Sequence, residues 1–451
     1  MNNIFEISKS GLTAAQKALT VTSNNIANAN TDGYSRQRAE LVPAQVNQAG
    51  KSIPVGVSVS EVRRIRDILA DRQIFTQSNA LNASLEQSRI YRQLESVLIT
   101  DFGESLDSNI GNFFNAFSEL STAPQDISLR NNVLTQAEVL TSQLRTLDKD
   151  ITDIQDQVSL SAGTYIDRAN DLLQGISEIN GAIFRSFALG DQSNIIKDRQ
   201  VEMLNELSEL MDTQVSFTEA GTAEIRVGGV MVLNQDYVAQ LDAETSLTDN
   251  VFRVRNETGK QISLTGGRLG GAITMFTEGI PSVADQLDEI TEYLVTEVNQ
   301  IHSSGFGVVD GNQRAFFSTT GLTAGEIEVH TLIKENVGHI AASSVAGESG
   351  NNDKAIELNF LRDVKGLRGE SVTDRAIKTI SEPGIRINEL DVSIEVNESA
   401  LNLLRTQQEE VSGVNIDEEL SNLIKFQNAY QASARVLNTA QELLTTLLSI
   451  A

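Results

Sequence analysis

The feature that most constrains the fold of this chain is a long run of apolar residues between positions 140 and 183. Its members recur mostly at spacings of three and four: Leu140, Leu144, Leu147, Ile151, Ile154, Val158, Tyr165, Leu172, Ile176, Ile179 and Ile183. This rhythm, sustained over several heptads, predicts a long coiled-coil helix. About 45 helical residues would extend roughly 65 Å at ~1.5 Å per residue, which describes a rod and not a globule.

The N-terminal end carries a narrower seam of the same kind. A helix is predicted from Ile4 to Asn28, with Asn3 as its N-cap and Glu6 in a capping-box relation. Gly33 is suited to the left-handed conformation in which helices often end. Small residues in the seam would allow another helix to approach closely; its members are Ile4, Ile7, Gly11, Ala14, Ala18, Val21 and Asn25.

The C-terminal end repeats this design. A last helix is predicted to begin after Gly413, with Asn415 as its N-cap and Glu418 reaching back from the third helical position. After Phe426 this helix has only two charged residues, so most of its surface is apolar or uncharged. Its seam consists of Leu420, Leu423, Gln427, Tyr430, Ala434, Leu437, Gln441, Leu444 and Leu448.

Helices and strands are both predicted between the two ends. Residues 34–62 read as extended and 67–98 as a second long helix. After the long central helix, short β-type runs separated by Gly, Asn and Asp turns fill Gln214–Leu264. A helix is predicted at about 272–302, and it is followed by further turns and short strands to about residue 350.

Two other segments complete this outline. The glycine-rich run at 266–271 is not followed by the Gly-Lys-Ser/Thr of a phosphate loop, so it is interpreted as a turn from strand to helix. Helical periodicity returns after residue 370, where one helix is marked by Ile387, Leu390, Ile394, Leu401, Leu404 and Val411.

These elements predict a protein that is mainly α with a β domain. Long antiparallel coiled-coil helices from both termini form a rod, and a central mostly-β domain is inserted in it. The expected parts are a terminal helical assembly domain at 1–40 and 412–451, a helical rod domain at 41–212 and 365–411, and a central mostly-β domain at 213–364 with a helix at about 272–302.

The two terminal helices are expected to need partners. Isolated helices are marginal in water, and chain ends are usually mobile unless they are docked. One interpretation is that the two helices only pair with each other within a monomer. The other, which we favour, is that they also pack on equivalent helices of neighbouring subunits, because a two-helix pair leaves much of each surface uncovered.

The charge balance excludes several classes of partner. The 35 Lys and Arg residues stand against 61 Asp and Glu, and the net charge of −26 would repel nucleic acid and anionic membranes. The densest basic cluster, Arg63, Arg64 and Arg66, is interpreted as a solvated junction between a strand and a helix. No stretch approaches the ~20 apolar residues that span a bilayer, and no cleavable signal peptide is recognisable. The chain is therefore expected to be cytoplasmic or to be exported by a route that reads an uncleaved N-terminus.

Patterns typical of catalytic or metal sites are missing from the sequence. The chain has no cysteine, which excludes disulfides, thiolate catalysis and Cys-ligated metals. Its three histidines, His302, His330 and His339, are too far apart for a helical metal pair and are interpreted as structural. No catalysis, cofactor or metal is expected. A secreted hydrolase of cell-wall glycan is kept as the contrasting hypothesis.

Motifs at both ends resemble those of one known family. The run Thr22–Ser35 is similar to the N-terminal signature of flagellar rod, hook and hook-associated proteins. The run Val411–Leu444 is similar to the matching C-terminal signature. Residues 33–37 and 412–419, together with Asn299-x-x-His302-x-x-Gly305, are most similar to the hook-associated members. Another axial flagellar protein, of the hook or the distal rod, is the alternative.

The resemblance implies a structural subunit that joins the flagellar hook to the filament. It implies export through the flagellar type III apparatus, without a cleaved signal peptide, to the extracellular hook–filament junction. The implied partners are the hook protein, a neighbouring hook-associated protein, copies of the same chain in a ring, and a cytoplasmic export chaperone on the C-terminal helix. Longer members carry an additional outer domain, for which this chain has little room.

The seams and motifs together assign the assembly role to two groups of residues. The N-terminal group is Ile7, Ala14, Ala18, Val21, Asn24, Asn25, Asn28, Gly33 and Tyr34. The C-terminal group, which the chaperone would also contact, is Asn415, Glu418, Leu420, Leu423, Gln427, Tyr430, Ala434, Leu437, Leu444 and Leu448.

Overall fold

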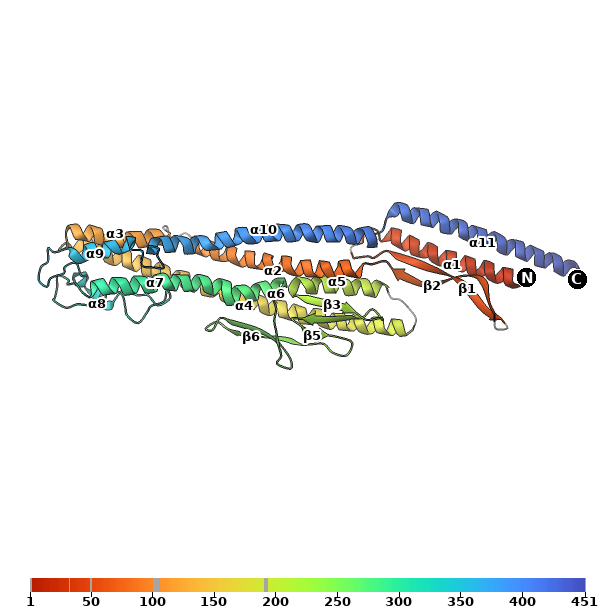
Figure 1. Ribbon diagram of the computed structural model, residues 1–451, viewed down its shortest axis with the longest axis horizontal. Helices are drawn as coiled ribbons and strands as arrows, with labels where there is room; N and C mark the ends of the chain where they lie inside the picture. The colour runs from red at the N-terminus through yellow and green to blue at the C-terminus, as the bar shows by residue number, and fades with distance from the viewer. Residues whose placement is uncertain (1, 32, 49–50, 100–104, 190–193, 451) are drawn as a thin grey trace.

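The molecule is a long rod in which helices lie side by side, and both chain ends lie at the same end of it (Figure 1). The computed structural model describes residues 2–31, 33–48, 51–99, 105–189 and 194–450, with the backbone alone at 2–3, 46–48, 51–54 and 447–450. The mainly α fold with a small β region confirms the predicted fold class. None of the described helices combines the length and the apolar character that crossing a bilayer requires.

The longest helix, α4, spans Ile127–Ala188 and confirms the predicted coiled-coil segment while extending it at both ends. Its N-cap is Asp126, whose side chain accepts a hydrogen bond from the Ser128 N–H at 2.7 Å. The apolar seam read from the sequence is buried except at Tyr165 and Ile179. With 62 residues, the helix measures roughly 93 Å at ~1.5 Å per residue.

Four further helices build the rod around α4. They are α2 (Ile68–Ile99), α3 (Leu106–Thr122), α5 (Asn194–Leu210) and α10 (Val372–Ser412). The helix α10 packs mainly on α2, and α2 packs in turn on α4 and α5. As a result α10 runs along one side of the rod and α4 with α5 along the other (Figure 1).

Two small antiparallel sheets lie against this rod. The first contains β3 (Thr213–Phe217), β4 (Ala223–Val227) and β5 (Val230–Leu233), and the second contains β6 (Leu241–Ser246), β7 (Val251–Asn256) and β8 (Gln261–Ile262). Each sheet has its strands in sequence order, as expected for a meander of short strands joined by tight turns. The predicted β-type runs between 214 and 264 are confirmed.

The next helical stretch begins earlier than predicted. It consists of α6 (Gly267–Thr274), a π-helical turn (Met275–Gly279) and α7 (Ile280–His302). The glycine-rich run is therefore part of a helix and not a simple turn. Its glycines permit close packing, because a Cβ on Gly271 would lie 2.6 Å from the backbone oxygen of Ala83 in α2.

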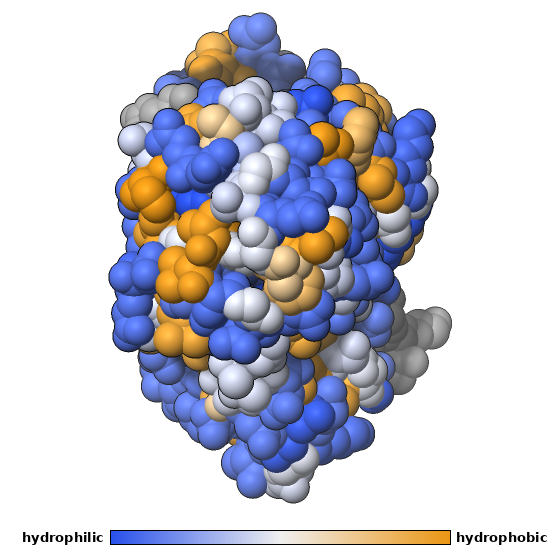
Figure 2. Space-filling model, turned by 90° about the vertical axis from the view of Figure 1, so that its left-hand side faces the viewer, coloured by the Kyte–Doolittle hydropathy of each residue, from blue (hydrophilic) through white to orange (hydrophobic). Residues whose placement is uncertain are grey.

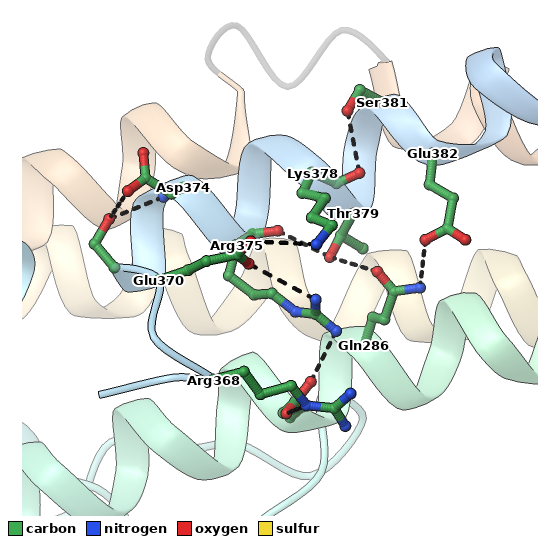
Figure 3. Close-up of polar contacts among 11 residues, drawn as sticks. Gln286, Arg368, Glu370, Asp374, Arg375, Lys378, Thr379, Ser381 and Glu382 are labelled. Atoms are coloured by element: carbon green, nitrogen blue, oxygen red, sulfur yellow. Dashed lines mark hydrogen bonds and ion pairs between the residues drawn. The ribbon is translucent and has the colours of Figure 1, made fainter. Parts of the chain in front are cut away.

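Polar side chains join α10 to α7 (Figure 3). The buried Arg375 of α10 donates to Glu289 of α7 at 2.9 Å. Gln286 of α7 donates to Glu382 at 2.7 Å and accepts from the Thr379 hydroxyl at 3.2 Å. Helix α10 is thus held on α7 as well as on α2, and all three belong to one rod.

The segment after α7 differs from the prediction. Within the described residues it has no strands, only the isolated bridges Phe306–Ser343, Phe317–Val329 and Leu367–Glu370. Its regular elements are the short helices α8 (Thr331–Glu335) and α9 (Asp353–Phe360) and 3-10 turns at Val337–His339 and Leu361–Asp363. Strand pairing is prevented because much of the backbone bonds to side chains instead: the N–H groups of Phe316 and Phe317, for example, donate to Asn299 Oδ1 at 2.9 and 2.8 Å. Viewed end-on, this tip of the rod shows small apolar groups separated by polar ones (Figure 2).

The terminal part lies at the opposite end of the rod. It contains α1 (Asn2–Ala27), the hairpin β1 (Gln37–Gln48) and β2 (Lys51–Arg64), and α11 (Ile416–Ile450). The helices α1 and α11 lie side by side and run antiparallel, and α1 also packs on the hairpin (Figure 1). The side chain of Asn3, the predicted cap of α1, lies outside the described residues.

The hairpin packs on α1, although the predicted boundaries place most of it in the rod domain. The Val57 N–H donates to Ser10 Oγ at 3.2 Å. Gly56 has φ +126°, and a Cβ there would lie 1.9 Å from the same Ser10 oxygen. This glycine therefore lets the strand lie directly on α1.

Candidate assembly site at the chain ends

Residues of the N-terminal motif meet around the side chain of Asn25, which is 1% exposed. Its Nδ2 donates to the backbone oxygen of Gln37 at 2.8 Å and to Glu419 Oε2 at 3.1 Å. Its Oδ1 accepts from the Tyr34 hydroxyl at 2.9 Å and from the Gln37 N–H at 3.0 Å. One amide side chain therefore positions the end of α1, the turn before β1 and the start of α11 relative to one another.

Arg36 connects the N-terminal motif to the C-terminal one. Its Nε donates to Glu419 at 2.8 Å, and its two Nη atoms donate to the Glu418 carboxylate at 3.0 and 2.7 Å. Its backbone N–H also donates to the Ser412 oxygen at 3.0 Å. A guanidinium fork suits this geometry because it can serve two carboxylates at once. Two motifs at opposite ends of the sequence thus form one polar network.

The start of α11 is capped as predicted, but without a capping box. Asn415 Oδ1 accepts from the N–H groups of Asp417 at 3.0 Å and Glu418 at 3.2 Å. The expectation that Glu418 reaches back is wrong, because Arg36 holds its carboxylate through two charge-assisted hydrogen bonds.

The charges of this network are stabilised mutually. Hydrogen bonding to Arg36 lowers the pKa of Glu418, and the same bond raises the pKa of Arg36. Burial, with the nearby carboxylates of Asp198 and Glu419, raises the pKa of Tyr34 to about 12. The tyrosine therefore stays a neutral hydrogen-bond donor over the whole physiological range.

Ion pairs continue the network from the terminal part into the rod. Arg66 donates to Asp71 at 2.5 Å, and Asp71 also accepts from Gln408 of α10. Arg64 donates to Asp198 of α5 at 2.9 Å. The basic cluster was expected to be solvated. Arg63 is exposed, as expected, but the Arg64 and Arg66 side chains are only 15% and 12% exposed. Their charges are balanced by acidic residues of the rod, and this cluster has a structural role.

The predicted residues of the N-terminal seam divide into buried and exposed ones. Ala14, Ala18 and Val21 are buried on α1. Gly11 lies against α11, where a Cβ on it would come within 2.7 Å of Ser433 Oγ. Ile7, near the free end of the helix, is 43% exposed. The seam therefore builds the α1–α11 contact through small residues.

The remaining residues of the N-terminal motif shape the turn after α1. Asn28 Nδ2 donates to the Asn24 oxygen at 2.9 Å, and the Asn24 side chain is exposed. Gly33 has φ +76°, the left-handed conformation that was predicted. Asn24, Asn28 and Tyr34 line one cavity of about 430 Å³ that also touches Asn194 and Ile195 at the start of α5.

The predicted C-terminal seam is only partly covered by α1. Leu423, Ala434 and Leu437 are half-buried, whereas Gln427 is exposed and Leu420, Tyr430 and Leu444 are 46, 40 and 39% exposed. The side chain of Leu448 lies outside the described residues. The residues of α11 that are buried include Glu419 and Ala440, so polar and small side chains form part of the contact.

The pairing of α1 with α11 leaves apolar residues of α11 uncovered. Ile416, Leu420 and Ile424, called here the outer stripe of α11, are 46, 46 and 57% exposed. Their spacing of four places them on one face of the helix. Val436 and Leu443 are also about half exposed, at 47 and 52%. The folded chain thus presents an open apolar surface along its last helix.

Sequence reasoning missed the residues that carry most of the polar network. Arg36, Glu419 and Asp71 have no apolar periodicity, so the search for seams passed over them. A signal was available, because Arg36 and the acidic pair Glu418–Glu419 lie inside the two terminal motifs and have opposite charges.

A third motif, Asn299 to Gly305, organises the tip of the rod. Asn299 binds the backbone of Phe316 and Phe317, and His302 Nδ1 donates to the Arg314 oxygen at 2.7 Å. His302 Nε2 accepts from the Ala341 N–H at 2.8 Å, and burial lowers the pKa of this histidine to about 4. The structural role predicted for His302 is confirmed.

Comparison with known proteins identifies the family. A model described as the flagellar hook-associated protein FlgK helical domain matches residues 91–317, just over half of the chain. Models of flagellar basal-body rod proteins match only the ends, at residues 5–34 and 406–450. The helical-domain match therefore favours the hook-associated branch over the hook and distal-rod alternatives.

Individual relatives agree with this assignment over the whole length. "Flagellar hook-associated protein 1" of Bacillus subtilis is 28% identical, with 98% of this chain and 96% of the relative aligned. The protein of the same name from Salmonella typhimurium is 26% identical over 559 aligned positions that include all of both chains, so it has residues without counterpart here. The structure of the flagellar hook junction protein FlgK from Burkholderia pseudomallei has the same fold, with a TM-score of 0.67 over 76% of this chain and all of that one at 13% identity.

The matched family settles the class of protein that the motifs suggested. Its members are structural proteins of the flagellum, which also contradicts the alternative of a cell-wall hydrolase. Other flagellar proteins are accordingly its partners, and the flagellum outside the cell is its location. The chain belongs to the FlgK family of flagellar hook-associated proteins, and its role is structural, at the hook–filament junction.

Proposed function

We propose that copies of this chain assemble at the junction through the open faces of α1 and α11. The observation that carries this proposal is the outer stripe of α11, which stays exposed after α11 has paired with α1. Apolar side chains on a helix with few charges gain free energy when neighbouring helices remove them from water. The pairing of the two ends within a monomer is then the base on which contacts between subunits are built.

The proposed partners of these faces are copies of this chain in a ring, the hook protein, and a neighbouring hook-associated protein. The polar network around Asn25 and Arg36 supports this, because it gives the α1–α11 pair a defined orientation on the rod. A rigid orientation lowers the entropy lost when subunits associate.

Before assembly, we propose that a cytoplasmic chaperone covers the last helix. Leu443 and Leu444 are 52 and 39% exposed, and the helix continues with further apolar residues. Export through the flagellar type III apparatus without cleavage of the N-terminus belongs to the same proposal. It is supported by α1, whose buried face begins at Ser8 and contains the predicted assembly residues Ala14, Ala18, Val21 and Asn25.

A division of the chain into parts follows from the same contacts. We propose that the terminal assembly part comprises α1, the β1–β2 hairpin and α11, because these pack on one another. The rod comprises α2 to α5 with α10, and the central part comprises β3 to β8, α6 and α7 with the tip. Compared with the division predicted from sequence, the hairpin moves to the terminal part.

The substitution Ile424→Asp in a strain that lacks the native chain tests this role. It places a charge on the outer stripe while leaving the α1 contact intact, whereas Leu437→Asp would also disturb the α1–α11 pair. We expect cells with hooks, no attached filaments, and filament protein shed into the medium. Ser421→Asp, which adds the same charge at an exposed polar position one turn away, is the matched control and should restore swimming. Normal filament attachment with Ile424→Asp would contradict the proposed role of this face.

A further inference from the structure

Two exposed apolar surfaces lie on the rod, apart from the terminal helices. The first, called here the α10 ridge, consists of Ile385, Val392, Val396, Leu403 and Val411, which are 47–63% exposed. Their spacing keeps them along one side of α10. The opposite side of the helix contains Ile387 and Leu401, which are buried. Thus α10 has two apolar faces, and only one of them is covered within the chain.

The second surface is a groove between α4 and α5 with a volume of about 540 Å³. It is called here the α4–α5 groove, and its lining is mainly apolar: Gly175, Ile179, Ala182, Ile195, Ile196 and Met203. Gly175 makes room for the Met203 side chain, because a Cβ at this position would lie 2.3 Å from Met203 Cε. Ile195, which is 77% exposed, also lines the cavity at Asn24 and Tyr34, so the groove continues toward the terminal part.

The ridge and the groove lie at the same level of the rod but on opposite sides. Gln408, beside Leu403, contacts Asp71, and Asp198, beside Ile196, contacts Arg64. Both contacts are made at the joint between β2 and α2. The two surfaces are separated by α2, which packs on α10 with one side and on α5 with the other (Figure 1).

The charges around the two surfaces differ. The groove lining contains one acidic and one basic side chain, Glu178 and Arg199, and Arg185 lies close by. Arg199 also pairs with Glu202 at 2.6 Å, so the charges around the groove nearly balance. The ridge is flanked by the exposed acidic residues Glu395 and Glu410. In a chain with a net charge of −26, most contacts between copies would be repulsive. A groove whose charges nearly balance can receive an acidic flank without this repulsion.

We propose that the α10 ridge of one copy packs into the α4–α5 groove of the next copy. This inference rests on the proposed function, in which copies of the chain stand side by side, and it names the surfaces that they use. Because the two surfaces are different and lie on opposite sides, the contact is heterologous, and its repetition closes a ring or extends a helix. Leu403 would lie nearest to Ile196 and Met203.

Disulfide formation tests this contact directly, because the chain has no cysteine of its own. The full chain with Leu403→Cys and Ile196→Cys is produced in cells that lack the native copy, and isolated hook–filament complexes are oxidised. Cβ atoms about 3.5–4.5 Å apart are needed for a disulfide, so a bond can form only between the ridge and groove of different copies. We expect a ladder of dimers, trimers and larger covalent species.

Matched variants separate this contact from accidental collisions. Each single cysteine variant should give no ladder, since it offers only half of every contact. Leu403→Cys combined with Leu160→Cys should also give none. Leu160 is 75% exposed on α4 but lies at least 15 residues, roughly 22 Å along the helix, from the groove. A ladder with this control pair would overturn the inference, because it would show that the cysteines meet without a defined contact.

The outcomes distinguish the inference from the proposed function. Complexes that contain the Leu403→Cys, Ile196→Cys chain but show no ladder overturn the ridge–groove contact and leave the junction role intact. Absence of the unmodified chain from the complexes would contradict the junction role itself. If the cysteine variant is not exported, a charge on the ridge decides: Leu403→Asp should reduce incorporation, whereas Asn402→Asp, at the exposed polar position beside it, should not. Equal incorporation of the two variants overturns the inference.

Discussion

The helices α4 and α11 have similar patterns in the sequence and different surroundings in the structure. The seam of α4 is buried almost throughout, because α2, α3, α5, α7 and the sheets surround it. The α11 seam has α1 as its main partner, and three of its apolar members remain 39–46% exposed. A periodic apolar seam thus predicts that a helix has a partner, but it does not say whether the partner lies in the same chain.

The two regions also differ in what they bury. The core of the rod contains large side chains, including a group of five phenylalanines at its tip: Phe113, Phe114, Phe117, Phe316 and Phe317. The α1–α11 contact contains several small side chains, such as Gly11 and Ser433, which remove little apolar area from water. We therefore expect the rod to unfold as a unit and the ends to open separately at a lower free energy.

The largest expected effect comes from truncating the phenylalanine group. Phe113 is 0% exposed, with ring centroids 5.3 Å from Phe117 and 5.7 Å from Phe316. Phe113→Ala should lower the free energy of unfolding of the rod by about 3–5 kcal/mol, since it leaves a cavity that the packed rings cannot fill. Denaturant unfolding followed by circular dichroism measures this. Val21→Ala in the terminal seam is the comparison, and it should leave the unfolding transition of the rod unchanged. If both substitutions lowered the free energy of unfolding of the rod equally, the two regions would not differ as we expect.

A second effect of nearly this size concerns pH. The pKa of His302 falls from 6.5 to about 4 on burial, so between these pH values the unfolded chain binds a proton that the folded chain does not. Above pH 6.5 the histidine is neutral in both the folded and the unfolded chain, so its titration does not affect the free energy of unfolding. As the pH falls toward 4, the free energy of unfolding decreases by about 3 kcal/mol in total. His302→Gln keeps a donor and an acceptor but cannot titrate. Its unfolding free energy should therefore depend less steeply on pH across this window, and an unchanged slope would rule out the assignment.

A smaller effect is expected from the network that joins the two ends. Arg36→Met leaves the Glu419 carboxylate, 2% exposed, without its guanidinium partner. We expect local opening of α1 and α11 to become easier by about 2 kcal/mol, with faster amide exchange there and unchanged exchange in α4. Arg38→Met is the control. Because the Arg38 side chain is 69% exposed, this substitution should leave amide exchange unchanged in α1, α11 and α4.

The difference between the regions also explains what could be predicted from sequence. The long helices and the short strands from 213 to 262 follow from apolar periodicity, which burial confirmed at Leu144 and Ile176. The strands expected after residue 303 do not form, because side chains such as Asn299 take the backbone hydrogen bonds of that segment. A propensity for extended structure cannot reveal such long-range partners.

For the candidate site, sequence patterns located the right segments and missed their geometry. Asn25, Tyr34 and Asn415 lie in motifs and take part in the contacts that join the ends. The face of α11 could not be placed, since a helix with apolar residues on several sides has no single seam, and only packing on α1 selects one. The Glu418 carboxylate binds Arg36 instead of forming a capping box, because a hydrogen bond from a charged guanidinium is stronger than one from a neutral N–H.

The smallest expected effect sharpens the same comparison at the first turn of α11. Asn415→Ala removes the acceptor of the Asp417 and Glu418 N–H groups and should destabilise α11 by about 1 kcal/mol. Asn415→Asp, which keeps the acceptor and adds negative charge at the positive end of the helix, should be neutral or slightly stabilising. Amide exchange in α11 of the dilute chain measures both. Because the ends open independently of the rod, neither change should alter exchange in α4, and a matching change there would show that the two regions unfold together.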